Sequence, residues 1–291
     1  MIIAIASGKG GTGKTTVATS LALSLSPLIP VQVLDCDVEA PNTHLFLKPE
    51  IERQVPATLP VPVIDEAACQ HCGQCAEVCQ YNAITVVGGS MLVFPDLCHG
   101  CGSCALNCPE GALIEEARRL GVLESGRAKG GIQFARGILD IGQPLAVPVI
   151  HQLKQWAPAS SGVTIIDSPP GTSCPVVETV RGADYVMLVT EPTPFGLHDL
   201  HLAYQLTQEL NISTGVIVNR DGFGDAGVDE FCTEHDLPVL LRIPLDRGLA
   251  AALAQGTTLV AYNPQYRLRF QRVFDAIRRE GKESDATTAR R

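Results

Sequence analysis

Short apolar runs alternate along the chain with longer segments whose apolar residues recur at helical spacing. The runs that we predict to be strands cover residues 2–6, 31–34, 163–166, 185–189, 215–218 and 238–243. The predicted helices lie near residues 14–25, 174–181, 198–210 and 246–254. Strands that are apolar throughout are typical of a parallel sheet covered on both faces. The alternation therefore predicts an α/β fold with a doubly wound, mostly parallel sheet.

The alternation is interrupted between residues 35 and 163. A proline-rich stretch over 56–62 predicts an extended linker into a separate unit. The expected organisation is therefore a first part of the α/β domain, an inserted unit, a second part of the α/β domain and a polar, disordered tail, over residues 1–61, 62–117, 118–280 and 281–291. Residues 118–160 return the chain to the sheet, but their pattern assigns no particular elements.

Composition and charge exclude several classes of protein. The 291 residues are 45% hydrophobic and carry a net charge of −9, which excludes a disordered or fibrous chain and argues against a general binder of nucleic acid or anionic membranes. With no signal segment and no long apolar run, we expect a cytoplasmic protein without stable membrane insertion. Residues 54–117 contain no lysine or arginine, account for −7 of the charge, and hold 8 of the 11 cysteines. In the cytoplasm such clustered thiols bind metal more often than they form disulfides.

A phosphate-binding motif follows the first predicted strand. Residues 8–15 read Gly-Lys-Gly-Gly-Thr-Gly-Lys-Thr and fit G-x-x-x-x-G-K-[ST] directly before a predicted helix. Backbone N–H groups of such a loop surround a phosphate, Lys14 would reach the β- and γ-phosphates, and the Thr15 hydroxyl would ligate Mg²⁺. A merely glycine-rich turn would not require a Lys-Thr pair at the helix start. The residues expected to contact nucleotide here are Gly8, Lys9, Gly10, Gly11, Thr12, Gly13, Lys14, Thr15 and Thr16.

The second lysine of this motif, Lys9, gives a more specific resemblance. Residues 9–15 resemble the deviant Walker A motif of the MinD/ParA/nitrogenase iron protein class of P-loop ATPases. The resemblance implies that Lys9 reaches the nucleotide of a partner subunit in an ATP-sandwich dimer, a homodimer or a heterodimer with a related ATPase. A cation supplied in this way stabilises the transferring phosphoryl group only when two subunits close.

Three further segments resemble parts of the same class. Residues 34–42 are similar to switch I, in which Asp37 would position the attacking water, and residues 166–172 are similar to the Walker B and switch II region, in which Asp167 would hold Mg²⁺ through water. Asn219 ends a strand in the manner of the asparagine that reads adenine. The resemblance thus implies ATP and Mg²⁺ as ligands and Lys9, Lys14 and Asp37 as catalytic residues.

The cysteine block contains an internal duplication. The run Cys69, Cys72, Cys75 and Cys79 recurs 29 residues later, and residues 69–84 align with 98–113 at seven identities in sixteen positions. The spacing is that of a bacterial two-cluster ferredoxin, in which the fourth cysteine of each run ligates the other cluster. We therefore expect an inserted small α+β ferredoxin domain of the bacterial type with two [4Fe-4S] clusters. Cluster one would be held by Cys69, Cys72, Cys75 and Cys108, and cluster two by Cys98, Cys101, Cys104 and Cys79.

Zinc is the competing interpretation of this block, because C-x2-C pairs also form tetrahedral zinc sites. Zinc sites seldom use four consecutive cysteines at the same spacing twice, which favours the clusters. Of the other cysteines, Cys36 and Cys232 are expected to be buried small residues. Cys174 lies at a place similar to the bridging cluster cysteine of the nitrogenase iron protein, so a shared third cluster is an alternative for it.

Almost the whole chain resembles the MinD superfamily ATPases that contain an inserted ferredoxin domain. We expect an ATPase in which closure of a dimer gates electron transfer through the clusters to a partner. The acidic insert predicts a basic redox partner protein. The alternatives are an ATP-dependent scaffold, a redox-sensing switch or an iron-sulfur cluster carrier or assembly factor. A ParA-like organiser of DNA or membrane would use the basic residues 267–291, which a solvated helix face explains more simply.

Overall fold

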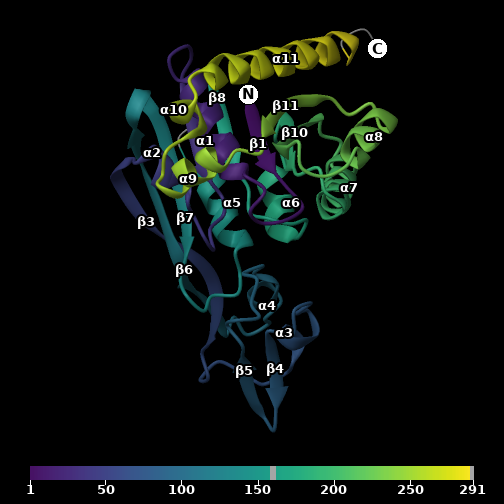
Figure 1. Cartoon of the computed structure of the whole chain (residues 1–291). Helices are drawn as coiled ribbons and strands as arrows, with labels where there is room; N and C mark the ends of the chain where they lie inside the picture. The colour runs from purple at the N-terminus through teal and green to yellow at the C-terminus, as the bar shows by residue number, and fades with distance from the viewer. Residues whose placement is uncertain (158–161, 289–291) are drawn as a thin grey trace.

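The computed structural model describes residues 1–157 and 162–288, with side chains up to residue 280. Its centre is a nine-stranded sheet in the order β11-β10-β9-β1-β8-β2-β7-β6-β3 (Figure 1). Seven neighbouring strands are parallel, namely β11 (Val239–Pro244), β10 (Thr214–Asp221), β9 (Tyr185–Thr190), β1 (Ile2–Ala6), β8 (Val163–Asp167), β2 (Val31–Asp35) and β7 (Ile132–Leu139). β6 (Leu113–Ala128) and β3 (Glu50–Ile64) complete the sheet as an antiparallel pair. The predicted α/β class and all six predicted strands are confirmed.

Helices cover both faces of the sheet, so adjacent residues of a central strand enter two different cores. Ile3 and Ile5 pack on one face with α1 (Lys14–Leu25), α9 (Arg247–Ala254), α10 (Leu259–Tyr262) and α11 (Gln265–Thr288). Ala4 and Ala6 face the other core, which contains residues of α5 (Val147–Trp156), α6 (Cys174–Val180), α7 (Pro194–Glu209) and α8 (Gly227–Glu234). This double burial explains why the strands read as continuous apolar runs.

The stretch expected to be a linker is a strand instead. Pro56, Pro60 and Pro62 all belong to β3, whose register pairs them with Val122, Ala117 and Glu115 of β6. β3 is the edge of the sheet, and proline is tolerated in an edge strand because the missing N–H is not needed for a further neighbour. The prolines therefore extend the chain, as predicted, and they also prevent another strand from pairing with this edge.

Residues 118–160, left unassigned by the pattern, contain most of β6, a short 3-10 turn (Lys129–Gly131), β7 and α5, while residues 158–161 lie outside the described part. α11 continues as backbone helix to Thr288, past residue 280 where the sequence predicts a disordered tail to begin. Residues 289–291 of that predicted tail also lie outside the described residues.

The cysteine-rich segment projects from the far ends of β3 and β6 (Figure 1). It comprises α3 (Gln74–Glu77), the antiparallel hairpin of β4 (Ile84–Val87) and β5 (Ser90–Val93), and α4 (Ser103–Leu106). β4 and β5 form a sheet of their own. The expected boundaries at 61/62 and 117/118 fall inside β3 and β6, so the insert is carried on a continuous two-stranded extension of the large sheet.

Candidate functional site

The loop between β1 and α1 surrounds a buried lysine. Lys14 is 7% exposed, and its ammonium group donates to the Ser7 hydroxyl at 3.0 Å and to the Lys9 carbonyl at 3.4 Å. Burial lowers the pKa of Lys14, while the charges of Asp167 and Asp37 oppose that shift. Gly13 ends the loop at φ 104°, a conformation that favours glycine, and begins α1. These features form a cationic cradle at a helix N-terminus, as a phosphate-binding loop requires.

A buried carboxylate cluster lies beside this cradle. Asp167, at the end of β8, accepts hydrogen bonds through one oxygen from the hydroxyls of Thr15 at 2.6 Å and Thr43 at 2.9 Å. Its other oxygen, Oδ1, is buried without a hydrogen-bond partner among the described residues. An unpaired carboxylate oxygen next to a threonine hydroxyl fits a magnesium site, since Mg²⁺ binds oxygen ligands and retains waters. Burial raises the pKa of Asp167.

Two further carboxylates follow β2. Asp35 is fully buried and accepts from the backbone N–H groups of Asp37 at 3.2 Å and Thr43 at 3.0 Å. Burial, followed by the charge of Asp167, raises the pKa of Asp35. Burial also raises the pKa of Asp37, and Lys14 opposes that shift. Sequence reasoning missed Asp35 and Thr43. The position of Asp35 directly at a strand end was an available signal, whereas Thr43 gave none.

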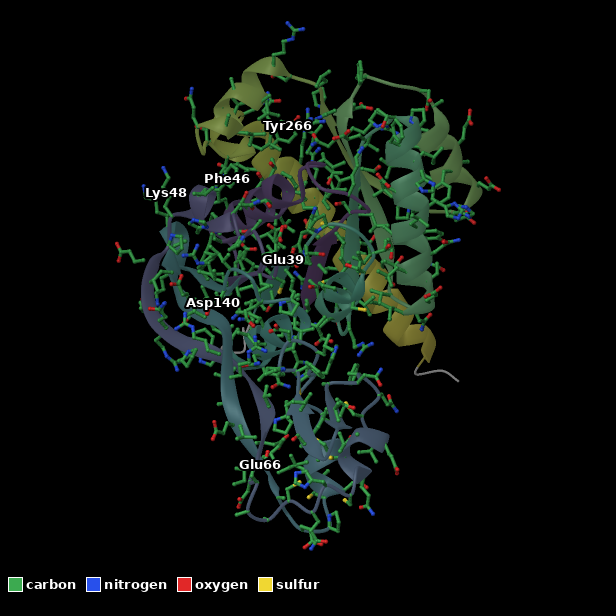
Figure 2. The ribbon with its side chains drawn as sticks, turned by 90° about the horizontal axis from the view of Figure 1, so that it is seen from below. Glu39, Phe46, Lys48, Glu66, Asp140 and Tyr266 are labelled. Atoms are coloured by element: carbon green, nitrogen blue, oxygen red, sulfur yellow. The ribbon has the colours of Figure 1, made fainter. Side chains whose placement is uncertain are left out.

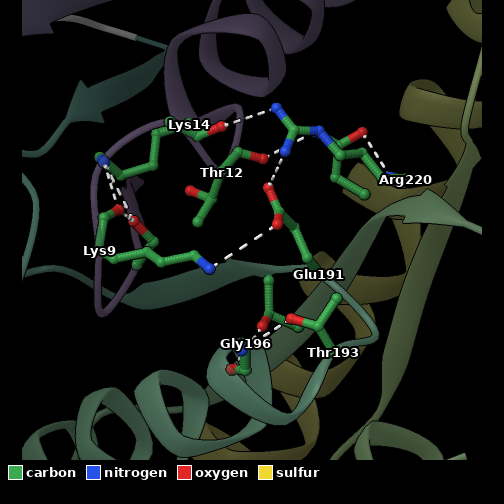
Figure 3. A network of polar contacts seen from close by, with 11 residues as sticks. Lys9, Thr12, Lys14, Glu191, Thr193, Gly196 and Arg220 are labelled. Atoms are coloured by element: carbon green, nitrogen blue, oxygen red, sulfur yellow. Dashed lines mark hydrogen bonds and ion pairs between the residues drawn. The ribbon is translucent and has the colours of Figure 1, made fainter. Parts of the chain in front are cut away.

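Lys9 takes part in an ion-pair network within its own chain (Figure 3). Its ammonium nitrogen lies 3.7 Å from Glu191, and the other oxygen of Glu191 lies 2.8 Å from the guanidinium of Arg220. Arg220 also reaches the carbonyl of Gly11 at 3.5 Å. Glu191 follows β9 and Arg220 belongs to β10, so the sheet order brings both to the loop after β1. From sequence, residues 191–199 are expected only to have a positioning role around the nucleotide, and Arg220 has no assigned role.

Asn219 lies against the phosphate-binding loop. Its amide nitrogen donates to the Thr12 carbonyl at 2.7 Å, and its amide oxygen accepts from the N–H of Arg220 at 2.9 Å. A side chain at Gly13 would meet this amide, because a Cβ there would lie 2.5 Å from its nitrogen. Each amide atom has capacity for one more hydrogen bond. Contact with adenine therefore stays a prediction that this geometry permits.

Two pockets in the insert gather the eight repeated cysteines into sets of four. One pocket is lined by Cys79, Cys98, Cys101 and Cys104, and the other by Cys69, Cys72, Cys75 and Cys108. These are the two sets expected from the crossed ferredoxin pairing, with the fourth cysteine of each run on the other pocket. No cysteine among them is in a disulfide.

The thiols surround these pockets without meeting at one point. Nowhere in residues 1–157 and 162–288 do three or more Cys, His, Asp or Glu side chains converge as ligands of a single metal ion. A zinc ion would hold four sulfurs at about 2.3 Å from one centre. Four thiols on the walls of one pocket suit a group that presents four separate iron corners, so the residues fit a [4Fe-4S] cluster.

The duplication is also visible in the backbone of the insert. Left-handed φ values occur at three pairs of positions 29 residues apart: His71 and Gly100, Gly73 and Gly102, and Asn82 and Gly111. The last cysteine of each run accepts an equivalent hydrogen bond at 3.3 Å, Cys79 from the N–H of Ala83 and Cys108 from that of Ala112. The two halves therefore have the same local geometry.

The two halves differ in what they pack against. Cys98 and Ala83 line the first pocket and belong to a large hydrophobic core. This core also contains Leu59 of β3 and Val38 of the loop that follows β2, here called the β2 loop. The second pocket lies against a smaller core, which includes Cys75, Met91 and Leu113 and against which Cys79 and Cys104 of the first pocket also pack. The pocket assigned to cluster two thus contributes residues to the core of the α/β domain, whereas the described lining of the pocket assigned to cluster one contributes none to it.

The remaining three cysteines are Cys36, Cys174 and Cys232. Cys36 and Cys232 are buried, as expected, and burial raises the pKa of each thiol. Cys174 is exposed at the first turn of α6.

The parallel sheet and the phosphate-binding loop at its carboxyl edge define an α/β P-loop nucleotide-binding protein. The sequence profile of the CobQ/CobB/MinD/ParA nucleotide binding domain, CbiA, matches residues 3–260, and the chain belongs to this family. Among solved structures, the septum site-determining protein MinD of Pyrococcus horikoshii, complexed with Mg-ADP, aligns with a TM-score of 0.56 at 19% identity, covering 92% of this chain and 93% of that one. At that identity the likeness shows the fold alone.

Three relatives of Methanocaldococcus jannaschii match at the level of sequence. An uncharacterized protein is 31% identical over 245 residues, 84% of this chain and 86% of that protein. An iron-sulfur cluster carrier protein is 24% identical over 301 residues, 97% of this chain and 86% of its own length. An uncharacterized ferredoxin is 43% identical over 58 residues, which cover 19% of this chain and 32% of the ferredoxin. In this chain's described part, no helix is both long and apolar enough to cross a membrane.

Proposed function

We propose that this protein is an ATPase in which nucleotide-dependent closure of a dimer gates electron transfer through two [4Fe-4S] clusters to a partner protein. The observation that carries the proposal is the shared core of the β2 loop and the cluster-two pocket, because it joins the nucleotide site to the proposed redox centre by packed side chains. Each part of the proposal has its own support.

The first part concerns ATP. Lys14 would contact the β- and γ-phosphates, and Thr15 with Asp167 would hold Mg²⁺, which supplies positive charge to the phosphates when bound. Asp37 would orient the attacking water, since it lies within the electrostatic reach of Lys14 at the end of the second parallel strand. Lys9 would reach the nucleotide of the other subunit after leaving Glu191. The dimer would consist of two copies of this chain or of this chain and a related ATPase.

The second part concerns the clusters. The crossed cysteine sets that line the two pockets support two [4Fe-4S] clusters, and the 58-residue similarity to a ferredoxin supports the same assignment. A bound cluster would supply one-electron redox chemistry. The chain's own contribution is to pack the wall of one of the two pockets into the α/β core.

The third part concerns coupling between the sites. Val38 follows Asp37 directly, and its carbonyl accepts from the N–H of Leu139 at 2.8 Å at the end of β7. The next N–H, that of Asp140, donates to the carbonyl of Leu120 in β6 at 2.9 Å. β6 is continuous with the insert, which precedes it in the chain. A change in the loop that holds Asp37 therefore has a hydrogen-bonded path to the strand that carries the clusters, as coupling between two sites requires.

The fourth part concerns the partner. The lysine- and arginine-free segment carries seven acidic residues, and each oxidised cluster with its thiolates adds about −2 by formal counting. A redox partner with a basic docking surface fits this charge, and the association should weaken with salt. The proposal requires neither nucleic acid nor a membrane.

The second candidate function is an ATP-dependent scaffold, redox-sensing switch or carrier of iron-sulfur clusters. Two observations favour it: the 24% identity to a carrier protein over 97% of the chain, and the exposure of one cysteine in each pocket, Cys72 and Cys101. Transfer of iron and sulfide to an apo-acceptor protein, faster with ATP than with ADP, would support this function over electron transfer.

The deciding experiment is a redox titration monitored by electron paramagnetic resonance, with Mg-ADP and with a slowly hydrolysed ATP analogue. We expect the analogue to shift the potential of one cluster or its rate of transfer to an acceptor. Lys9→Ala is the control, because it should keep the clusters and the nucleotide but lose closure. Unchanged potentials and rates in the wild-type protein with both nucleotides would rule the proposal out.

A further inference from the structure

A cleft of about 580 Å³ separates the insert from the α/β domain. Its lining includes Leu59 and Pro60 of β3 and the start of α5. Its volume is in the range of sites that bind small molecules, and its walls are mainly apolar. None of the ATP-site residues described above lines it, and the proposed hydrolysis does not use it.

One wall of this inter-domain cleft is shared with the cluster-two pocket. Tyr81, His99 and Cys101 line both cavities. The rings of Tyr81 and His99 are stacked with centroids 3.8 Å apart and an interplanar angle of 13°. The Cys101 residue beside them is exposed. A molecule in the cleft would therefore touch an aromatic pair and one of the four thiols proposed to hold cluster two.

The lining also includes residues of both segments that approach the nucleotide. Glu39 lies two residues after Asp37, and Cys174 lies seven residues after Asp167. Figure 2 labels Glu39 in the α/β domain and Glu66 in the insert. Each segment thus continues from a nucleotide-site aspartate to the lining of the cleft.

The charges of the lining restrict the occupant. Among the described residues that line the cleft, none is lysine or arginine, and Glu39 is the one carboxylate. Of its two imidazoles, that of His151 is engaged at both nitrogens, by Glu178 at 2.8 Å and Gln155 at 2.7 Å. An anion would find no cationic partner here, so the lining favours a neutral molecule. The stacked ring pair favours a flat aromatic one.

We propose that the inter-domain cleft binds a neutral, planar aromatic electron acceptor of the flavin or quinone type. This inference rests on the proposed function, since it names the molecule that would take electrons from cluster two. The two reduced clusters together would lose two electrons, and the ring with two protons from water would become its dihydro form. A one-electron donor protein would reduce the clusters again.

The test measures binding of riboflavin and menadione to the oxidised protein with both clusters, by equilibrium dialysis. Cys174→Trp should fill the cleft from the α6 side and weaken binding at least tenfold, whereas Cys174→Ser should bind as the wild type does. Tyr81→Ala should weaken binding about fivefold through loss of ring contact. Flavin mononucleotide, which adds a phosphate to the same ring, should bind at least tenfold more weakly than riboflavin.

A kinetic measurement complements dialysis. The rate at which riboflavin reoxidises the reduced clusters should saturate with its concentration in the wild type and increase linearly in Cys174→Trp. An iron count of about eight per chain confirms that each variant is folded and loaded. The inference is wrong if the wild type shows no saturable binding of either ring, or if Cys174→Trp binds like the wild type. Because dialysis uses oxidised protein without nucleotide, its outcome is separate from a failure of nucleotide gating.

Discussion

The ion pair between Lys9 and Glu191 makes a quantitative prediction about dimer formation. If Lys9 must reach a nucleotide in the other subunit, its contact with Glu191 has to break in each of the two subunits. Glu191→Gln removes the charge that holds Lys9 while keeping the shape of the side chain. We therefore expect this substitution to strengthen ATP-dependent dimerisation.

The structure sets the magnitude. Lys9 is 33% exposed, its nitrogen lies 3.7 Å from a carboxylate that is only 10% exposed, and ion pairs in such settings contribute about 0.2–1 kcal/mol. For each Lys9–Glu191 contact we take the upper end of this free-energy range, because the Glu191 side chain is largely buried. Two contacts break per dimer, which gives about 2 kcal/mol and a dissociation constant about 30-fold lower in the variant. Arg220 also loses its partner, but its side chain is half exposed and water can solvate it.

The assay is analytical ultracentrifugation with the slowly hydrolysed ATP analogue and, separately, with ADP. Glu209→Gln, at an exposed position on α7, is the matched control and should dimerise like the wild type. In the background of Lys9→Ala, Glu191→Gln should give no gain, because the contact is already absent. A variant that binds ATP normally and dimerises no more tightly than the wild type would refute the reasoning. A gain that persists without Lys9 would assign the effect to Arg220.

Further predictions concern the other parts of the molecule. Because the folded-state pKa of Asp35 is raised, the folded chain binds more protons than the unfolded chain above pH 4, so Asp35 makes stability fall as pH rises toward about 8. Chemical denaturation should show that the free energy of unfolding of Asp35→Asn rises by about 1–2 kcal/mol relative to that of the wild type as the pH increases from about 6 to about 8. An equal pH dependence of the two proteins would contradict this. Gly100→Ala should destabilise the insert by about 1–3 kcal/mol more than Gly111→Ala in thermal unfolding, since both have positive φ but a Cβ at position 100 would lie 2.7 Å from a leucine of β3. Cys108→Ser and Cys79→Ser should each lose one cluster, and paramagnetic resonance should show that they lose different ones; the opposite assignment would favour uncrossed pairing. Electron transfer to a basic partner should slow as salt rises, and a rate independent of salt would exclude the acidic docking surface.

The nucleotide loop could be predicted from sequence because its chemistry is local. Gly13, Lys14 and Thr15 act through backbone and side chains within one turn of the chain, so their spacing contains the necessary information. Glu191 and Arg220 are different, because they meet Lys9 only when β9 and β10 take their places beside β1. The order of strands in a sheet is a long-range property that no local pattern records.

The errors in the fold prediction have a similar cause. The prolines of β3 indicate extended chain, and only the pairing with β6 makes this segment an edge strand and not a linker. β6 was missed because its half near the insert carries exposed charged residues, such as Glu115 and Glu116. Such a strand has no apolar run to mark it.

The duplicated cysteine runs show how the fold assigns different environments to equivalent sequences. The cysteine spacing and the left-handed φ values are the same in the two halves, so these local features do not distinguish cluster one from cluster two. The difference arises because the loop containing Gly100 packs against Leu59 and Pro60 of β3, so closely that a Cβ on Gly100 would not fit. The equivalent position in the first half, His71, instead lies next to Glu66 within the insert, at 3.4 Å. Contact with β3 thus connects one pocket to the core that contains the β2 loop. If ATP acts on a single cluster, this packing predicts that it is cluster two.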